Sequence, residues 1–138
     1  MIKTKVLIVD DDVAASRLLA LGLEKTGAFE VTVENVATRA LASARQFGPD
    51  VIFFDVCMPG ADGGDVAFQI HNDPRLKATP IIFLTSLVSG RETRAQAERG
   101  GYEFLPKPAS LAKVIDCIDR HLTRRAEMSG AATTADPG

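Results

Sequence analysis

The chain has 138 residues, 46% of them hydrophobic and 25% charged, with a formal net charge of −2 at pH 7. This composition is typical of one packed domain, and the small net charge without a long basic run argues against direct binding to nucleic acid or to an anionic membrane. Two isolated cysteines, no apolar run long enough to span a bilayer, and too short an apolar start for a signal peptide lead us to expect a cytoplasmic protein.

Strands and helices are predicted to alternate along most of the chain. Three unbroken apolar runs, VLIV, VIFF and IIFL, are typical of strands buried on both faces of a parallel sheet. Gly27, Gly48 and Gly100 stand just past helical stretches, where a cap favours a residue that tolerates positive φ. In chain order, the predicted elements are strand 6–9, helix 13–26, strand 29–34, helix 37–47, strand 51–54, helix 64–71, strand 81–84, helix 90–99, strand 102–105 and helix 110–123.

This alternation predicts an α/β fold, a doubly wound sheet of five parallel strands with five helices on its faces. Residues 126–138 contain almost no large apolar side chains. Because such a segment cannot bury enough surface to offset the entropy of ordering, we predict that it is a disordered tail. The predicted folded domain therefore spans residues 1–125.

Polar residues follow the predicted strands at their carboxyl ends, the edge at which open α/β sheets bind ligands. In chain order, these residues are Asp10, Asp11, Asp12, Asp55, Thr85, Ser86 and Lys107. Crowded carboxylates repel one another unless a cation or a proton relieves them, and an oxygen-only cluster suits a hard ion such as Mg²⁺. Because a lysine and a hydroxyl beside such an ion suit a phosphoryl group, the sequence predicts phosphoryl transfer to Asp55.

Each of these residues also has an ordinary structural interpretation. The aspartates at 10–12 are good N-caps for the helix that follows. Asp55 alone is more often a polar strand end than a nucleophile, Lys107 would ordinarily be a solvated loop residue, and Thr85 is common in strands. We favour the functional interpretation because four such coincidences at one edge of a sheet are improbable.

Four segments, IVDDD, VIFFDVCMPGADG, PIIFLTS and FLPKP, occur in this order. Together they resemble the receiver domain of two-component response regulators, the CheY-like family, and the resemblance covers residues 3–123. It implies a flavodoxin-like sheet with strand order 2-1-3-4-5. It also implies that Asp55 accepts a phosphoryl group from a phosphohistidine on a sensor histidine kinase or a phosphotransfer protein.

The resemblance further implies a metal site for Mg²⁺ or Mn²⁺. Asp11 would bind the ion directly and Asp10 largely through water. Asp55 and the backbone carbonyl of Cys57 would complete the protein ligands. We expect the thiol of Cys57 to have no separate role, because no histidine stands near it in sequence to activate it.

The remaining implied roles concern the phosphoryl group and the response to it. Lys107 would pair with phosphoryl oxygens, and its peptide bond to Pro108 would be cis. The hydroxyl of Thr85 would move to bond one of those oxygens, and Phe104 holds the position of the switching aromatic. The signal would then leave through protein contacts of the fourth helix, fifth strand and fifth helix, at 88–123.

Three positions depart from the usual pattern of the family. Ser16 stands where an arginine is common, Gly64 replaces a frequent leucine, and Ala109 replaces an aromatic residue that often follows the lysine and proline. None of the three touches the predicted phosphorylation chemistry. They leave open the choice of partner and the packing of the loops around the site.

The other cysteine and the two histidines are expected to be structural. Cys117 stands among apolar residues of the last predicted helix, so we predict that it belongs to the core. His71 and His121 lie near predicted helix ends, and we expect surface or capping positions for both.

Two other functions compete with the signalling interpretation. A haloacid dehalogenase-like phosphatase would also use an aspartate nucleophile, but it would carry a second aspartate at the position that Cys57 occupies. A flavodoxin-like cofactor binder would need glycine and hydroxyls after the first strand, where this chain has acidic residues. We therefore expect a signalling phosphoacceptor, not an enzyme, which assists its own phosphorylation and slow dephosphorylation, either as a single-domain regulator or as a receiver taken from a larger protein.

Overall fold

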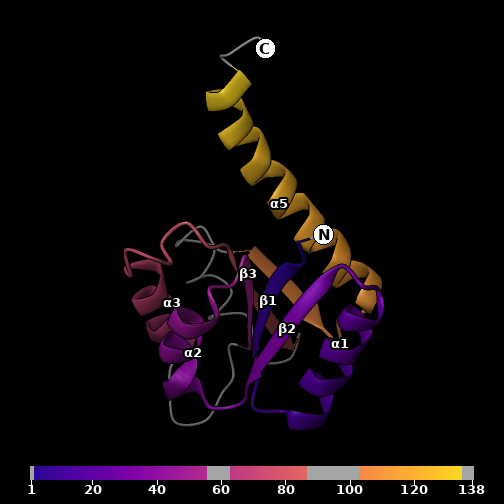
Figure 1. Cartoon of the computed structure of the whole chain (residues 1–138). Helices are drawn as coiled ribbons and strands as arrows, with labels where there is room; N and C mark the ends of the chain where they lie inside the picture. The colour runs from indigo at the N-terminus through magenta and orange to yellow at the C-terminus, as the bar shows by residue number, and fades with distance from the viewer. Residues whose placement is uncertain (1, 56–62, 87–102, 135–138) are drawn as a thin grey trace.

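The computed structural model describes residues 2–55, 63–86 and 103–134. The predicted alternation of strands and helices is confirmed there (Figure 1). The helix predicted at 90–99 lies outside the described residues. The elements are β1 (Thr4–Val9), α1 (Val13–Lys25), β2 (Phe29–Glu34), the 3₁₀ turn η1 (Ala37–Arg39), α2 (Ala40–Phe47), β3 (Val51–Asp55), α3 (Gly63–His71), β4 (Ile81–Ser86), β5 (Glu103–Lys107) and α5 (Leu111–Thr134).

The five strands form one parallel sheet in the order β2-β1-β3-β4-β5, which confirms the predicted fold and strand order. The direction of strand succession reverses beside β1, which lies between β2 and β3. Val9 pairs with Phe54 across this switch point. The next residues, Asp10 and Asp55, therefore stand side by side at the carboxyl edge, where ligands of such sheets bind.

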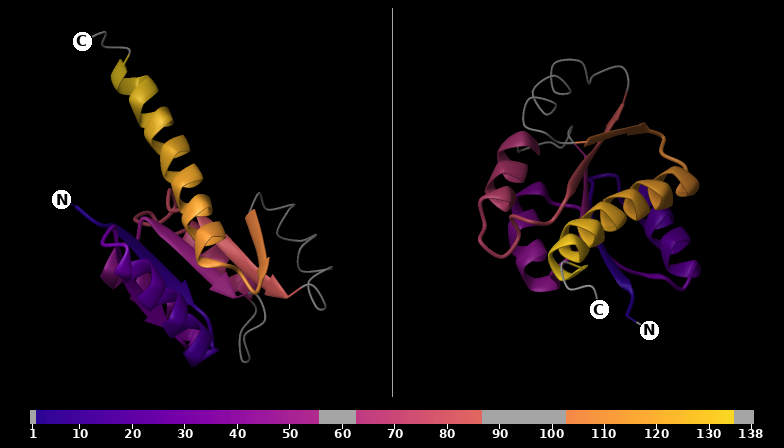
Figure 2. Two further views of the ribbon diagram at one scale, coloured as in Figure 1. Left: turned by 90° about the vertical axis from the view of Figure 1, so that its right-hand side faces the viewer. Right: turned by 90° about the horizontal axis from the view of Figure 1, so that it is seen from above.

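The apolar runs are continuous because helices cover both faces of the sheet (Figures 1 and 2). In β3, Val51 and Phe53 pack in a cluster with residues of α1 and α5. Ile52 and Phe54 point to the opposite face and pack with residues of α2 and α3. All four side chains are fully buried, which agrees with the predicted doubly covered sheet.

The start of β3 follows a helix that ends as the sequence predicts. Gly48 is the C-cap of α2 and has φ +66°, a conformation that residues with a Cβ rarely adopt. Its N–H donates to the carbonyl of Ala44 at 2.9 Å. The chain is thereby turned from α2 into the central strand that carries Asp55.

The length of α5 differs from the prediction. The sequence predicted a helix that ends at 123, but α5 continues to Thr134 and projects beyond the body of the domain (Figures 1 and 2). Residues 135–138 of the predicted tail lie outside the described residues. Alanine, glutamate and methionine are strong helix formers, and AEM and AA occur in this segment. The prediction considered only burial, which is why it placed the helix end too early.

Within the described part of the chain, no helix has the length and apolar character that crossing a membrane requires.

Candidate functional site

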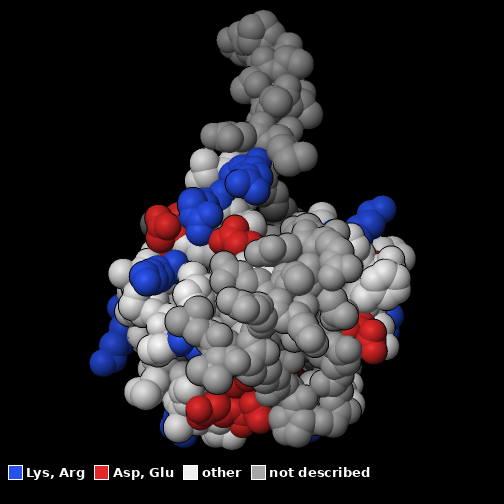
Figure 3. Space-filling model, turned by 180° about the vertical axis from the view of Figure 1, so that it is seen from behind, with Lys and Arg blue, Asp and Glu red and all other residues white. Residues whose placement is uncertain are grey.

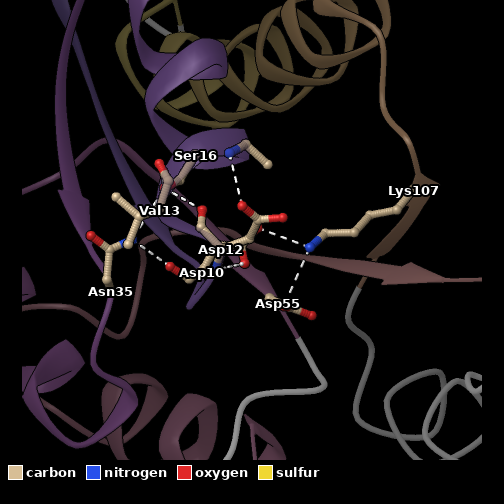
Figure 4. Close-up of polar contacts among 8 residues, drawn as sticks. Asp10, Asp12, Val13, Ser16, Asn35, Asp55 and Lys107 are labelled. Carbon is tan, nitrogen blue, oxygen red and sulfur yellow. Dashed lines mark hydrogen bonds and ion pairs between the residues drawn. The ribbon is translucent and has the colours of Figure 1, made fainter.

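Three residues from three different strands meet at the carboxyl edge of the sheet. Lys107, at the end of β5, places its Nζ 2.9 Å from Oδ2 of Asp10 and 3.3 Å from Oδ2 of Asp55 (Figure 4). The two aspartates are buried, with 2% and 6% of their surface exposed. The structure thus brings these three predicted site residues into one cluster.

Asp11 completes a group of three carboxylates with Asp10 and Asp55. One carboxylate oxygen from each of the three lies within 4.8 Å of the others. Asp11 itself is exposed. Oxygen ligands on one side and solvent on the other suit Mg²⁺, which keeps several of its waters when a protein binds it. The donor set therefore fits the predicted ion, and Cys57, the fourth predicted ligand, lies outside the described residues.

The third aspartate of the run, Asp12, has a different role. Its Oδ1 accepts a hydrogen bond of 3.0 Å from the backbone N–H of Ala15, which makes it the N-cap of α1. Its own N–H donates to Oδ1 of Asp10 at 2.9 Å. The capping interpretation is thus correct for Asp12, and its N–H also helps to hold Asp10 in the cluster.

Burial and charge act against each other in this cluster. Burial raises the pKa of Asp10, and hydrogen bonds from Lys107 and from the N–H of Asp12 offset only part of the rise. Burial alone would lower the pKa of Lys107, but its hydrogen bond with Asp10 and the charges of both Asp10 and Asp55 outweigh burial, so its pKa is raised. Lys107 is therefore a fixed cation between two buried carboxylates.

Two residues that support the cluster were not predicted as part of it. Asn35 donates from Nδ2 to the backbone carbonyl of Asp10 at 2.6 Å and to Oγ of Ser16 at 3.1 Å (Figure 4). The buried Ser16 donates in turn to the carbonyl of Asp12 at 2.8 Å. Asn35 directly follows β2, so the strand-end criterion that found Asp10 and Asp55 would have found it as well.

A cavity of about 430 Å³ adjoins the cluster on the side of α1. Asp10 and Lys107 line it together with Ser16 and Ala109, two positions at which the family commonly has larger side chains. The small side chains leave this space beside the acidic group.

Acidic side chains also gather at the lower edge of the molecule in the view of Figure 3.

Thr85 and Phe104 belong to the face of the sheet that α2 and α3 cover, opposite the face that α1 and α5 cover. Thr85 is buried and lies two residues after Phe83, whose ring packs with α2 and α3. Phe104 pairs with Phe83 in the register of β4 and β5, and the centroids of the two rings are 5.7 Å apart. In the register of the sheet, Asp55 pairs with Leu84, so Thr85 lies one residue beyond this level and Phe104 one residue before it. The peptide bond between Lys107 and Pro108 is cis, as the resemblance implied.

The other cysteine and the histidines follow the prediction in part. Cys117 is fully buried, as predicted, and His71 is exposed at the end of α3. His121 is only 15% exposed and lies 3.0 Å from Glu103, so it is neither a free surface residue nor a helix cap.

A parallel sheet of this order, with an acidic group at its switch point and a lysine that reaches this group from β5, is an α/β domain of the flavodoxin-like type. Residues 6–119 match the family described as the response regulator receiver domain, and the chain belongs to this family. This assignment removes the two alternatives, a dehalogenase-like phosphatase and a flavin binder.

Relatives support the assignment over most of the chain. The sequence is 39% identical to the response regulator PleD of Caulobacter vibrioides over 75% of this chain, and 36% identical to the transcriptional regulatory protein ResD of Bacillus subtilis over 92% of it. The chain spans 23% of the first relative and 51% of the second.

Solved structures show the same fold. The chemotaxis response regulator CheY4 of Vibrio cholerae superposes with a TM-score of 0.77 at 28% identity, covering 87% of this chain and 99% of that one. A CheY-like receiver domain protein from Methanospirillum hungatei has a TM-score of 0.82 at 23% identity and covers 92% of this chain and 99% of that one.

Proposed function

We propose that this receiver domain is phosphorylated on Asp55 by a histidine kinase or a phosphotransfer protein, in a reaction that requires Mg²⁺ or Mn²⁺. The observation that carries the proposal is the ammonium group of Lys107 between Asp10 and Asp55. It holds a positive charge beside the carboxylate that would accept the phosphoryl group. Asp55 is also the residue that ends the central strand at the switch point.

In the proposed reaction, an oxygen of Asp55 attacks the phosphorus atom as the bond between phosphorus and the donor's imidazole nitrogen breaks. The bond's electron pair stays with the imidazole. Lys107 binds a phosphoryl oxygen and stabilises the charge that spreads over the group in the transition state. Asp10 and Asp11, with Asp55 and the carbonyl of Cys57, would hold the metal ion. When bound, the ion would supply further positive charge for the phosphoryl oxygens.

The output of the proposed phosphorylation is a change in protein contacts on the face that includes β5 and α5. Phe104 of β5 packs against Phe83 of β4, and Thr85 lies two residues after Phe83 in β4. A hydroxyl drawn toward a phosphoryl group on Asp55 would disturb this packing. The predicted fourth helix, part of the same proposed face, lies outside the described residues.

The partners and the location follow from the same proposal. We propose a cytoplasmic protein whose direct partners are proteins. Some relatives, such as the DNA-binding response regulator MtrA of Mycobacterium leprae, are named for DNA binding. For this chain we keep the prediction of no direct nucleic-acid contact, because it has a net charge of −2 and no long basic run.

Phosphorylation in solution with acetyl phosphate and Mg²⁺ tests the proposal. Mass spectrometry should show one added phosphoryl group on the wild type and none on Asp55→Asn. Asp116→Asn is the matched control, because Asp116 lies on α5 with its side chain 74% exposed. An unchanged phosphoryl adduct on Asp55→Asn would place the acceptor elsewhere.

A further inference from the structure

A second group of possible metal ligands lies away from the acidic edge, where β5 begins beside the middle of α5. It consists of Glu103, Cys117 and His121. The thiol of Cys117 lies 3.1 Å from Oε2 of Glu103, and Nε2 of His121 lies 3.0 Å from Oε1 of the same carboxylate. One possible ligand atom from each residue lies within 4.8 Å of the others.

The helix geometry brings two of these ligands together. Cys117 and His121 are four residues apart, so they lie on the same face of α5, one turn from each other. Pairs of metal ligands at this spacing on a helix can bind a single Zn²⁺. Glu103 reaches the pair from β5, so the ligands come from two elements that a bound ion would link.

We propose that Glu103, Cys117 and His121 form a binding site for Zn²⁺ or a similar transition-metal ion, with water in the fourth position. Thiolate, imidazole and carboxylate are the donors that zinc takes in proteins. One thiolate and one carboxylate would balance the charge of the ion. The oxygen-only group at the acidic edge suits Mg²⁺ instead, so the two sites would select different metals.

The exposure of the three side chains is compatible with entry of an ion from solvent. Cys117 is fully buried, but the side chains of His121 and Glu103 are 15% and 28% exposed and form the outer side of the group. In the metal-free protein, burial raises the pKa of Cys117 to about 12, so the thiol is protonated. On binding, the sulfur exchanges this proton for the metal, and the proton passes to solvent.

Arg120 offers the competing explanation of the cluster. Its Nη2 donates to Oε2 of Glu103 at 2.9 Å, so Glu103 already joins β5 to α5 through hydrogen bonds. A purely structural network of this kind would have no affinity for metal. In the metal-bound form, Glu103 would use one oxygen for the ion and the other for Arg120, an arrangement typical of residues that orient metal ligands.

Titration of the whole chain with Co²⁺ alone, in excess Mg²⁺ to fill the acidic site, tests the proposal. We expect one Co²⁺ per chain and a near-ultraviolet thiolate-to-cobalt absorption band, which Zn²⁺ should abolish by displacement. Cys117→Ser should lose the band. His121→Gln should weaken Co²⁺ binding by about 100-fold or more, because loss of a residue that only hydrogen-bonds to a metal ligand already lowers metal affinity by about 10- to 100-fold. His71→Gln is the matched control and should bind as the wild type does.

The absence of the band from the wild type would overturn the proposal, and so would a band that survives Cys117→Ser or disappears in Cys57→Ser. Glu103→Gln provides a test that leaves the buried thiol intact if Cys117→Ser is too unstable. Weaker Co²⁺ binding in that variant would support the site, and unchanged binding would overturn it. Because neither readout uses phosphorylation, the result is independent of the proposed function.

Discussion

Lys107 carries the only described cationic group paired with the acidic cluster, in which three carboxylates gather at the ends of two strands. Among the described residues, three carboxylates face one ammonium group, so we expect repulsion to remain in the metal-free protein. Burial is the main cause of the raised pKa of Asp10, and the charge of Asp55 adds a smaller rise. We therefore expect the cluster to gain stability when a metal cation binds, alone or together with a phosphoryl group.

Replacement of Asp55 by asparagine should therefore stabilise the metal-free protein. It removes one of the repelling charges while Lys107 keeps its hydrogen bond to Asp10. We expect a gain on the order of 1 kcal/mol, because charges in proteins interact through a high effective dielectric even at buried sites. Urea unfolding in EDTA measures the gain, and Mg²⁺ should then stabilise the wild type more than Asp55→Asn. Equal or lower stability of the variant in EDTA would show that repulsion is not significant.

Sequence reasoning predicted most of the described acidic site because strand ends of a parallel sheet converge. Asp10, Asp55 and Lys107 each follow or end a recognisable strand, so their meeting was predictable. Asn35 was not predicted because the strand before it, β2, is less apolar than the other strands. The residue after β2 was therefore not recognised as a strand-end residue. Asp10 joins the acidic cluster and Asp12 caps α1. Which aspartate has which role depends on where α1 starts, and sequence patterns do not predict a helix start to within one residue.

Among the elements, α2 is joined to the segment after α3 by an ion pair between a half-exposed arginine and a buried aspartate. Nε of Arg45 lies 2.6 Å from Oδ2 of Asp73, whose side chain is only 4% exposed. Oδ1 of Asp73 accepts a hydrogen bond of 2.8 Å from the N–H of Arg75. The hydrogen bond from Arg45 first, and that from Arg75 second, lower the pKa of Asp73. The pair thus joins α2 to the turn segment that follows α3.

Acid should remove the contribution of this ion pair to stability. Because the pKa of Asp73 is lower in the folded chain than its ordinary value of 3.8, its contribution is present above that value and is lost as the pH falls below it. Asp73→Asn should therefore lower the urea midpoint at pH 7 and have a smaller effect at pH 3. Arg45→Gln should show the same pH dependence if the pair is responsible. An effect of Asp73→Asn that is equal at both pH values would contradict this explanation.

The end of α5 shows where sequence reasoning about elements fails. Burial patterns predicted the part of the helix that packs on the sheet, including Val114, Cys117 and Ile118. They contain no information about residues 126–134, where the sequence offers helix formers but almost no large apolar side chains. Isolated helical segments have little stability of their own, so this end depends on the packed turns before it.

Truncation after Arg125 should leave the domain folded and able to be phosphorylated. The residues removed follow the part of α5 that packs in the core. We expect an unchanged unfolding midpoint and a loss of circular dichroism equivalent to the helical residues 126–134. A lower midpoint would show that this end of α5 supports the domain.

At the scale of the whole molecule, the two faces of the sheet have different proposed roles. Side chains alternate along each strand, so Asp10 and Asp55 extend the face that α1 and α5 cover. Thr85 follows Phe83 on the face that α2 and α3 cover, and Phe104 packs there as well. Lys107 links Asp55 directly to the end of β5, whereas the proposed route from Asp55 to Phe104 crosses the edge of the sheet through Thr85 of β4.

The final prediction concerns the coupling between phosphorylation of Asp55 and the packing of Phe104. Phe104 has no hydroxyl to bond at the surface, so it can favour one state only through burial of its half-exposed ring against Phe83. Couplings between sites are typically about 1 to 3 kcal/mol, a change of about 5- to 150-fold in population. We therefore expect a partly active face before phosphorylation and a further shift after it.

Amide NMR with beryllofluoride, a phosphoryl mimic, measures this shift in the wild type and in Thr85→Ala. The wild type should show changes around Asp55 and through residues 103–123, which include β5 and the packed part of α5. Thr85→Ala should keep the changes around Asp55 and lose most of those in residues 103–123, because the hydroxyl that links the two faces is gone. Changes confined to the surroundings of Asp55 in the wild type would mean that β5 does not carry the signal. A partner would then have to recognise the phosphorylated edge of the sheet directly.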